Sequence, residues 1–197
     1  MREFCKETDG LYRLRVPIEN IYTSVFLIDD AILVDCASTA EDVEAYIVPA
    51  LHKRGLALTD IKAIVITHAH SDHKGGLERV VSLAPDIEIV TDVKELGNGI
   101  STYPMAGHSD DSIGVLDERT RTLISADGLQ GAGVDKYRCY TQNPAAYVQT
   151  LERVRNDSRI ETVLFSHAYE PWNEDRVCGR DNVIRCIDEC YNYVNTE

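Results

Sequence analysis

The chain has 197 residues, and its 33 acidic side chains outnumber its 20 basic ones, which gives a formal charge of −13 at pH 7. This length fits one compact domain or a tightly fused pair of half-domains, and a hydrophobic content of 44% is too high for a disordered chain. The charge disfavours nucleic acid or an anionic membrane as the main partner, because both bind through clustered Lys and Arg. The N-terminus lacks the apolar core of a signal peptide, so we expect a soluble, cytoplasmic protein.

In chain order, the first half of the sequence predicts paired strands followed by helices. A capping box at Ser38-Thr39-Ala40-Glu41 predicts the start of a helix that runs to about Arg54. A β-branched apolar run at residues 61–66 predicts a buried strand, and a helix follows Gly75-Gly76 and stops near Pro85. The other expected strands are Leu11–Ile18, Ile21–Ile28, a short one at 31–34 that ends at Asp35, and 87–90.

The second half repeats this order. Asn98-Gly99 predicts a hairpin turn, and strands are expected at 112–116, 121–125 and Thr162–Phe165. Asn143-Pro144 predicts the start of a helix. The residues expected to face inward are Tyr147, Val148, Leu151 and Val154 in this helix, and Val183, Ile187, Cys190, Tyr191 and Val194 in a last helix. The repeated order predicts two similar α/β halves that face each other through their sheets.

Six cysteines occur without any Cys-x-x-Cys pair, which disfavours a zinc ribbon. Because nothing directs the chain to export, we expect them to be reduced and mostly structural. They are Cys5, Cys36, Cys139, Cys178, Cys186 and Cys190.

The motif His-x-His-x-Asp-His follows the buried strand at 61–66 and consists of His68, His70, Asp72 and His73. Alternate spacing lets two imidazoles converge on one ion, while Asp72 and His73 turn the other way and can serve a second ion. Imidazole with carboxylate suits zinc, and also iron or manganese. The alternative interpretation is a solvated polar loop.

Three more residues of ligand type lie at or just past the ends of other segments. His108 follows Gly107, Asp127 lies just past the strand at 121–125, and His167 lies just past Thr162–Phe165. Open sheets place their sites at the carboxyl ends of strands, so these positions favour a metal site. His52 is left over on a helix, and we interpret it as a surface or packing histidine.

This pattern resembles that of the metallo-β-lactamase superfamily. The resemblance covers nearly the whole chain and implies a single domain over residues 1–197. The fold it implies is an α/β four-layer αβ/βα sandwich of two mixed β-sheets with outer helices. It also implies that His68, His70 and His108 hold one metal, that Asp72, His73 and His167 hold another, and that Asp127 bridges them. Asp35 would support the site by contacting the ligands and not the metal.

Several branches of the superfamily fit less well. Zinc β-lactamases typically have a cysteine ligand where this chain has Asp127, and the quorum-signal lactonases have a tyrosine where it has Gln130. Type II glyoxalases carry a helical C-terminal extension, whereas 30 residues follow His167 here. Flavodiiron members replace the second histidine with glutamate, and the nuclease branches conflict with the charge. Without that extension and that tyrosine, the chain most resembles a minimal, single-domain member of the glyoxalase II and lactonase-like branch.

Substrate contacts are less well marked. Asp110 and Asp111 would discourage anionic substrates or hydrogen-bond ligand histidines, or they form a solvated turn. Aromatic residues after Asp127 and His167 either line a pocket or pack, and nearby cations either pair a substrate carboxylate or are solvated. These residues are Tyr137, Tyr140, Tyr169 and Trp172, and Lys74, Lys136 and Arg138.

The leading hypothesis is a metal-dependent hydrolase with a binuclear site, for which zinc is the expected metal. Two cations lower the pKa of a bridging water, and the resulting hydroxide attacks the carbonyl of a small acyl substrate such as a thioester, lactone or ester. Asp72 would orient the nucleophile. One alternative is a persulfide-dioxygenase-type oxidoreductase with a single iron on His68, His108 and Asp127. Another is a non-catalytic metal-binding domain. The sequence leaves the oligomeric state open.

Overall fold

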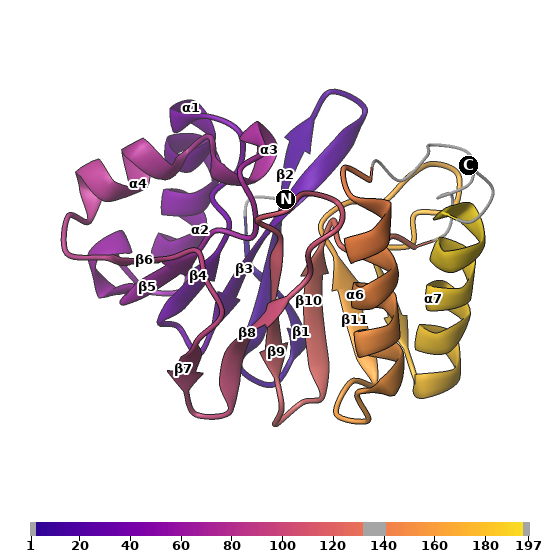
Figure 1. The fold of residues 1–197 in the computed structure, drawn as a ribbon. Coiled ribbons are helices and arrows are strands. Elements are labelled where there is room, and N and C mark those ends of the chain that lie inside the picture. The colour runs from indigo at the N-terminus through magenta and orange to yellow at the C-terminus, as the bar shows by residue number, and fades with distance from the viewer. Residues whose placement is uncertain (1–2, 132–140, 195–197) are drawn as a thin grey trace. The chain divides into compact units, whose positions relative to one another are not determined.

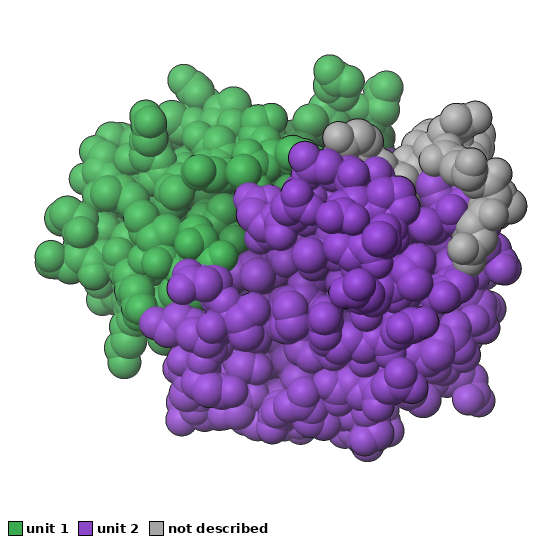
Figure 2. Space-filling view, viewed as in Figure 1, with its two compact units in different colours: residues 1–91 green, residues 92–197 purple. Residues whose placement is uncertain are grey.

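The computed structural model describes residues 3–131 and 141–194 of a chain that divides into two compact units, residues 1–91 and 92–197 (Figures 1 and 2). Each unit has a six-stranded mixed sheet with helices, which confirms the predicted α/β class with two mixed sheets. In the described ranges, no helix combines the length and the apolar character that a membrane span requires.

The sheet of the first unit runs in sequence order from β1 to β6. Neighbouring strands are antiparallel up to β4, and β4, β5 and β6 are parallel. The parallel strands therefore end at one edge, where the backbone N–H of Asp35 donates to the carbonyl of Val65 (2.8 Å). The strands are β1 (Cys5–Thr8), β2 (Leu11–Ile18), β3 (Ile21–Ile28), β4 (Ile32–Val34), β5 (Ala63–Val65) and β6 (Glu88–Val90).

The helices of the first unit pack on this sheet. Val43, Ile47 and Leu51 form one buried cluster with strand residues such as Leu14 and Leu27. The helical segments are α1 (Ala40–Asp42), the π-helix η1 (Val43–Ile47), α2 (Val48–Lys53), the 3-10 helix η2 (Leu58–Asp60), α3 (Ser71–Lys74) and α4 (Leu77–Leu83).

The helix predicted from the capping box differs in two details. Its cap is Thr39 and not Ser38, because the Thr39 hydroxyl accepts from the Asp42 backbone N–H (3.1 Å). Its middle is the π-helical segment η1, in which the Val48 N–H reaches the Val43 carbonyl. Pro49 has no N–H to continue the regular ladder, and the π-helical segment ends two residues before it.

The sheet of the second unit has the order β12-β11-β10-β9-β8-β7, and β10 and β11 form its parallel pair. Asn98 and Gly99 both have positive φ (51° and 74°), as the predicted hairpin turn between β7 and β8 requires. The strands are β7 (Glu95–Gly97), β8 (Ile100–Pro104), β9 (Ile113–Asp117), β10 (Thr122–Ala126), β11 (Thr162–Phe165) and β12 (Arg176–Cys178).

Helices α6 (Pro144–Asn156) and α7 (Arg180–Val194) lie side by side in the second unit (Figure 1). The predicted cap is confirmed, since the Asn143 side chain accepts from the Ala146 N–H (3.1 Å). Val148 was predicted to face inward but is only half-buried. Thr150 is buried in its place, and its hydroxyl donates to the Ala106 carbonyl (2.7 Å).

Some strands differ from the sequence-based prediction. The strand predicted at 61–66 is shorter, since β5 covers Ala63–Val65 only. Strands β1 and β12 were not predicted; both lie at sheet edges and carry polar residues such as Lys6 and Arg176. Half-exposed edge strands tolerate such residues, so their hydrophobic pattern is weak.

The described cysteines are free thiols, as predicted, and Cys139 lies outside the described residues. They are Cys5, Cys36, Cys178, Cys186 and Cys190.

Candidate metal centre

Three histidines of the first unit gather just beyond the end of β5. His68 Nε2 lies 3.0 Å from His70 Nδ1, and the ring centroids of His68 and His73 are 4.2 Å apart. His70 directly precedes α3, whose four residues include Asp72 and His73. The chain leaves the sheet at Val65 and enters α3 at Ser71, so the four side chains of the motif lie in one short connection from strand to helix and in the first turn of that helix.

Asp35 supports this loop from the end of the neighbouring strand β4. Its carboxylate is almost fully buried (1% exposed) and accepts from His73 Nδ1 (2.8 Å) and from the Thr67 N–H and hydroxyl (2.8 and 2.9 Å). With Nδ1 directed to Asp35, His73 presents Nε2, which lies 3.3 Å from an Asp72 oxygen. A carboxylate behind an imidazole in this way fixes the tautomer and orientation of a metal ligand.

The remaining three candidate ligands belong to the second unit and lie together. Asp127 directly follows β10, and His167 lies two residues after β11. His108 Nε2 is 3.6 Å from Asp127 Oδ2, and His167 Nε2 is 3.3 Å from Asp127 Oδ1. All three are buried, with exposed fractions of 4% to 8%. The two imidazoles thus lie near different oxygens of one carboxylate.

The N-terminal end of α6 fixes the position of His108. The backbone N–H groups of Gln142 and Asn143 donate to the carbonyls of His108 (3.2 Å) and Gly107 (3.0 Å). Gly107 has φ +141°, and a Cβ there would lie 2.5 Å from Tyr147 Cα, so the segment approaches the helix as closely as its backbone permits. Glycine before the histidine is therefore a packing requirement.

The donor set of each unit fits a divalent metal ion. Imidazole nitrogens and carboxylate oxygens are the ligands that zinc, iron and manganese take in proteins. Ligand atoms of His68 and His70 lie within 4.8 Å of each other, and so do those of Asp127 and His167. Such spacing allows neighbouring donors to share one ion, so these groups can hold metal.

The other predicted residues have mixed outcomes. His52 is exposed on α2, as expected. Asp110 accepts from the Asn143 amide (3.1 Å) and Asp111 from the Ser109 hydroxyl (2.6 Å), so both carboxylates stabilise the turn after His108. Lys74 and Trp172 are exposed and Tyr169 is half-buried, whereas Lys136, Tyr137, Arg138 and Tyr140 lie outside the described residues.

Sequence reasoning missed Thr67. Its hydroxyl donates to Asp35 and lies 3.1 Å from Nδ1 of His68, so it connects the buried carboxylate to the first histidine of the motif. Threonine is common in strands and carries no ligand signature of its own. Its place directly before His68 was the one signal for it in the sequence.

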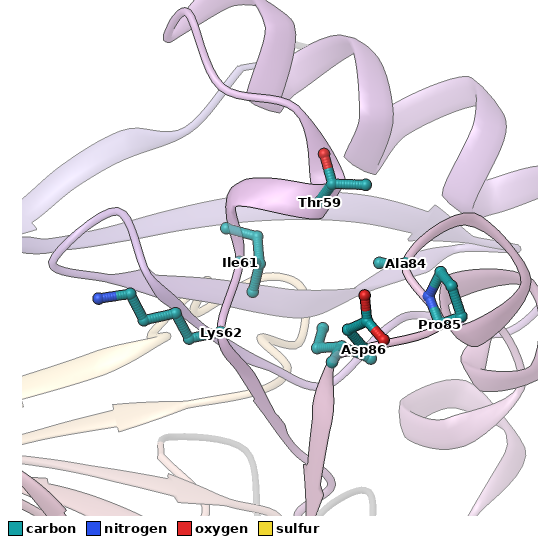
Figure 3. Close-up of a pocket in the computed structure, with 7 residues that line it drawn as sticks. Thr59, Ile61, Lys62, Ala84, Pro85 and Asp86 are labelled. Atoms are coloured by element: carbon teal, nitrogen blue, oxygen red, sulfur yellow. The ribbon is translucent and has the colours of Figure 1, made fainter.

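The first unit also has a cavity of about 290 Å³ that is lined by residues outside the histidine motif (Figure 3). Ile61 and Lys62 precede β5, and Asp86 and Ile87 precede β6, so the cavity lies at the amino ends of these parallel strands. The histidine motif follows their opposite, carboxyl ends. The residues that line the cavity are Thr59, Ile61, Lys62, Ala84, Pro85, Asp86 and Ile87, none of them a candidate ligand.

Comparison with known sequences points to one family. Residues 19–95 match the sequence model of the Metallo-beta-lactamase superfamily. A hydroxyacylglutathione hydrolase from Prochlorococcus marinus (strain MIT 9312) is 23% identical over 150 residues, which cover 64% of this chain and 60% of that protein. The chain thus spans about three fifths of the length of this relative.

Solved structures share the fold. The metallo-β-lactamase FIM-1 from Pseudomonas aeruginosa, in its mono-zinc form, aligns with a TM-score of 0.72 over 97% of this chain and 98% of its own, at 15% identity. A metallo-β-lactamase from Erythrobacter litoralis aligns with a TM-score of 0.67 over 94% and 96%, at 20% identity. The chain therefore has the fold of these metallo-β-lactamases, and its residues 19–95 match the sequence model of that superfamily.

Proposed function

We propose that the protein is a dinuclear metal-dependent hydrolase that cleaves a small acyl substrate. The observation that carries this proposal is the position of Asp127 between two imidazoles, with His108 at one oxygen and His167 at the other. A carboxylate that serves two ions needs such an arrangement. In this assignment one zinc would take His68, His70 and His108, the other would take Asp72, His73 and His167, and Asp127 would serve both.

The bound cations would acidify a coordinated water and polarise the carbonyl of the substrate. The residues of the chain then have separate tasks. Asp72, whose side chain is 30% exposed, would orient the attacking water and take up its proton. Asp35 holds His73 in one tautomer, with Nδ1 hydrogen-bonded and Nε2 turned toward Asp72. No serine or cysteine nucleophile is needed.

The substrate class rests on two supports. A distant relative is named for the hydrolysis of an acylglutathione, which is a thioester, and this places thioesters first among the candidates, before lactones and other esters. The net charge of −13 disfavours the phosphate backbone of nucleic acid and an anionic membrane surface as partners. Both supports favour a small molecule.

The first experiment is elemental analysis of the full chain purified without chelators or a metal-affinity column, followed by assays against thioesters and lactones. The proposal expects about two zinc or manganese ions per chain and acyl hydrolysis. Asp127→Ala should lower the metal content and abolish turnover, whereas Asp117→Asn, which alters a buried carboxylate paired with Arg119, should retain both. One iron per chain with sulfite formation from glutathione persulfide would overturn the hydrolase, as would full activity of Asp127→Ala.

A further inference from the structure

Helix α7 contacts the segment that follows Asp127 through two buried cysteines. The Cys186 thiol donates to the backbone carbonyl of Gln130 (3.1 Å), and the Cys190 thiol lies 3.7 Å from the same oxygen. The two cysteines are 1% and 0% exposed, and Gln130 is itself buried. Gln130 is three residues beyond Asp127, so this contact fixes the chain directly after a candidate ligand.

The loop that carries His167 is part of the same arrangement. Its two ends are joined by the Phe165 N–H, which donates to the Asp175 carbonyl (2.9 Å). A Cβ at Gly131 would lie 2.8 Å from the Phe165 ring and 2.9 Å from a Glu174 oxygen, so the segment after Asp127 packs directly on this loop. Arg185 of α7 also forms an ion pair with Glu174 (3.5 Å). One edge of α7 thus contacts both ligand-bearing segments.

The buried thiols are the stronger part of this contact. The Arg185–Glu174 pair is partly exposed, and such pairs contribute little. A buried backbone carbonyl needs a donor, and a thiol is a weak one, which accounts for two thiols directed at one oxygen. The neighbouring Cys190 thiol and burial raise the pKa of the Cys186 thiol, whereas the contact with Cys186 lowers the pKa of Cys190, so Cys186 is the thiol of the pair that holds its proton more firmly. Cys186, which makes the shorter of the two contacts, is therefore the main donor to Gln130.

A disulfide between the two cysteines would not fit this geometry. Both lie on α7 four residues apart, and residues at that spacing have Cβ atoms about 5–6 Å apart. A disulfide requires a Cβ separation of about 3.5–4.5 Å, so the helix would have to distort. The pair is suited to holding Gln130 as two thiols.

We propose that Cys186 and Cys190 are positioning residues that hold the Asp127 segment against the His167 loop and so set the spacing of two metal ligands. This inference rests on the proposed function, since it concerns the ligands of the proposed metal site. It predicts that the thiols influence metal affinity through Gln130, without touching the metal.

The test compares Cys186→Ala with Cys186→Ser in the full chain, and measures zinc affinity by chelator competition and stability by urea unfolding. Alanine removes the donor to Gln130, and zinc binding should weaken about tenfold, the lower end of what outer contacts of metal ligands contribute. Serine retains a donor and should bind zinc within about threefold of the wild type. Val183→Ala, which creates a cavity in the same buried cluster, should lower stability and leave zinc affinity unchanged.

The outcomes separate the inference from the proposed function. If the wild type takes up neither zinc nor manganese, both are overturned. If the wild type binds zinc and Cys186→Ala binds it equally well, the positioning role is wrong and the hydrolase proposal stands. If zinc affinity falls in proportion to stability across all three variants, the positioning role is also rejected, because such a loss is a purely structural effect. Should Cys186→Ala not fold, Cys190→Ala and Cys190→Ser provide the same comparison at the second thiol.

Discussion

The carboxylate of Asp35 accepts a hydrogen bond from Nδ1 of His73 at 2.8 Å, and both side chains are almost completely buried. The two residues are 38 positions apart: Asp35 directly follows β4, and His73 belongs to α3. Asp35 also accepts from Thr67, so one buried carboxylate organises the residues before and after His68. Asp35 thus holds the histidine motif of the first unit in position to bind a metal ion.

Asp35→Asn should weaken zinc binding by about 10- to 100-fold, as loss of an outer carboxylate typically does. Asp35 has φ +62°, a conformation that asparagine tolerates, so this variant changes the charge and the acceptor without adding backbone strain. Chelator competition provides the measurement. Asp30→Asn is the matched control, because Asp30 also has positive φ (54°) but pairs with Arg54 (2.6 Å). Equal affinity in the two variants would show that Asp35 does not tune the ligands.

Gly107→Ala should destabilise the chain by about 3 kcal/mol or more, because it combines an unfavourable φ with overpacking against Tyr147. Gly97→Ala separates the two effects. Gly97 also has positive φ (90°), but a Cβ there meets nothing within 4 Å, so its loss should be about 1 kcal/mol. Urea unfolding of both variants checks the difference. Equal losses would mean that the close contact of Gly107 with α6 contributes nothing to stability.

The ligands were predictable from the sequence because their residue types are uncommon and they follow recognisable strands. His68, Asp127 and His167 each come shortly after an apolar run, which is visible without any structure. The contact of Cys186 with Gln130 was not predictable. It joins positions 56 residues apart, and its acceptor is a backbone carbonyl, which every residue carries. The sequence marks the chemistry of a site more clearly than the packing behind it.

Tyr103 should make stability decline at alkaline pH. Burial and the nearby carboxylate of Asp157, to which its hydroxyl donates (3.2 Å), raise the pKa of Tyr103 to about 12. The unfolded tyrosine has a pKa of about 10, so between about pH 10 and 12 the unfolded state loses a proton that the folded state keeps. The contribution of this group is therefore complete below pH 10 and is lost as pH rises, by at most about 1.4 kcal/mol per pH unit.

Unfolding midpoints in urea from pH 8 to 11.5 test this dependence. Tyr103→Phe should flatten the decline above pH 10, while Tyr191→Phe, which removes a hydroxyl from α7, should retain it. Superimposable pH curves for the wild type and Tyr103→Phe would contradict the assignment. The position of Tyr103 on β8 and Asp157 at the end of α6 makes this a measure of how firmly α6 is held to the sheet.

Zinc should stabilise the folded chain, since the ligands of each unit are assembled only when that unit is folded. A ligand that binds the folded state alone adds about 4 kcal/mol at a free concentration 1,000 times its Kd, which corresponds to a rise in melting temperature of roughly 10 °C for a chain of this size. His167→Ala removes an imidazole from Asp127 and should diminish this rise, whereas His52→Ala removes an exposed imidazole on α2 and should leave it intact. Thermal melts of chelator-treated, metal-free protein at increasing zinc concentration make the comparison. An equal rise in the two variants would place the bound zinc elsewhere, and no rise in the wild type would remove the metal from the proposal.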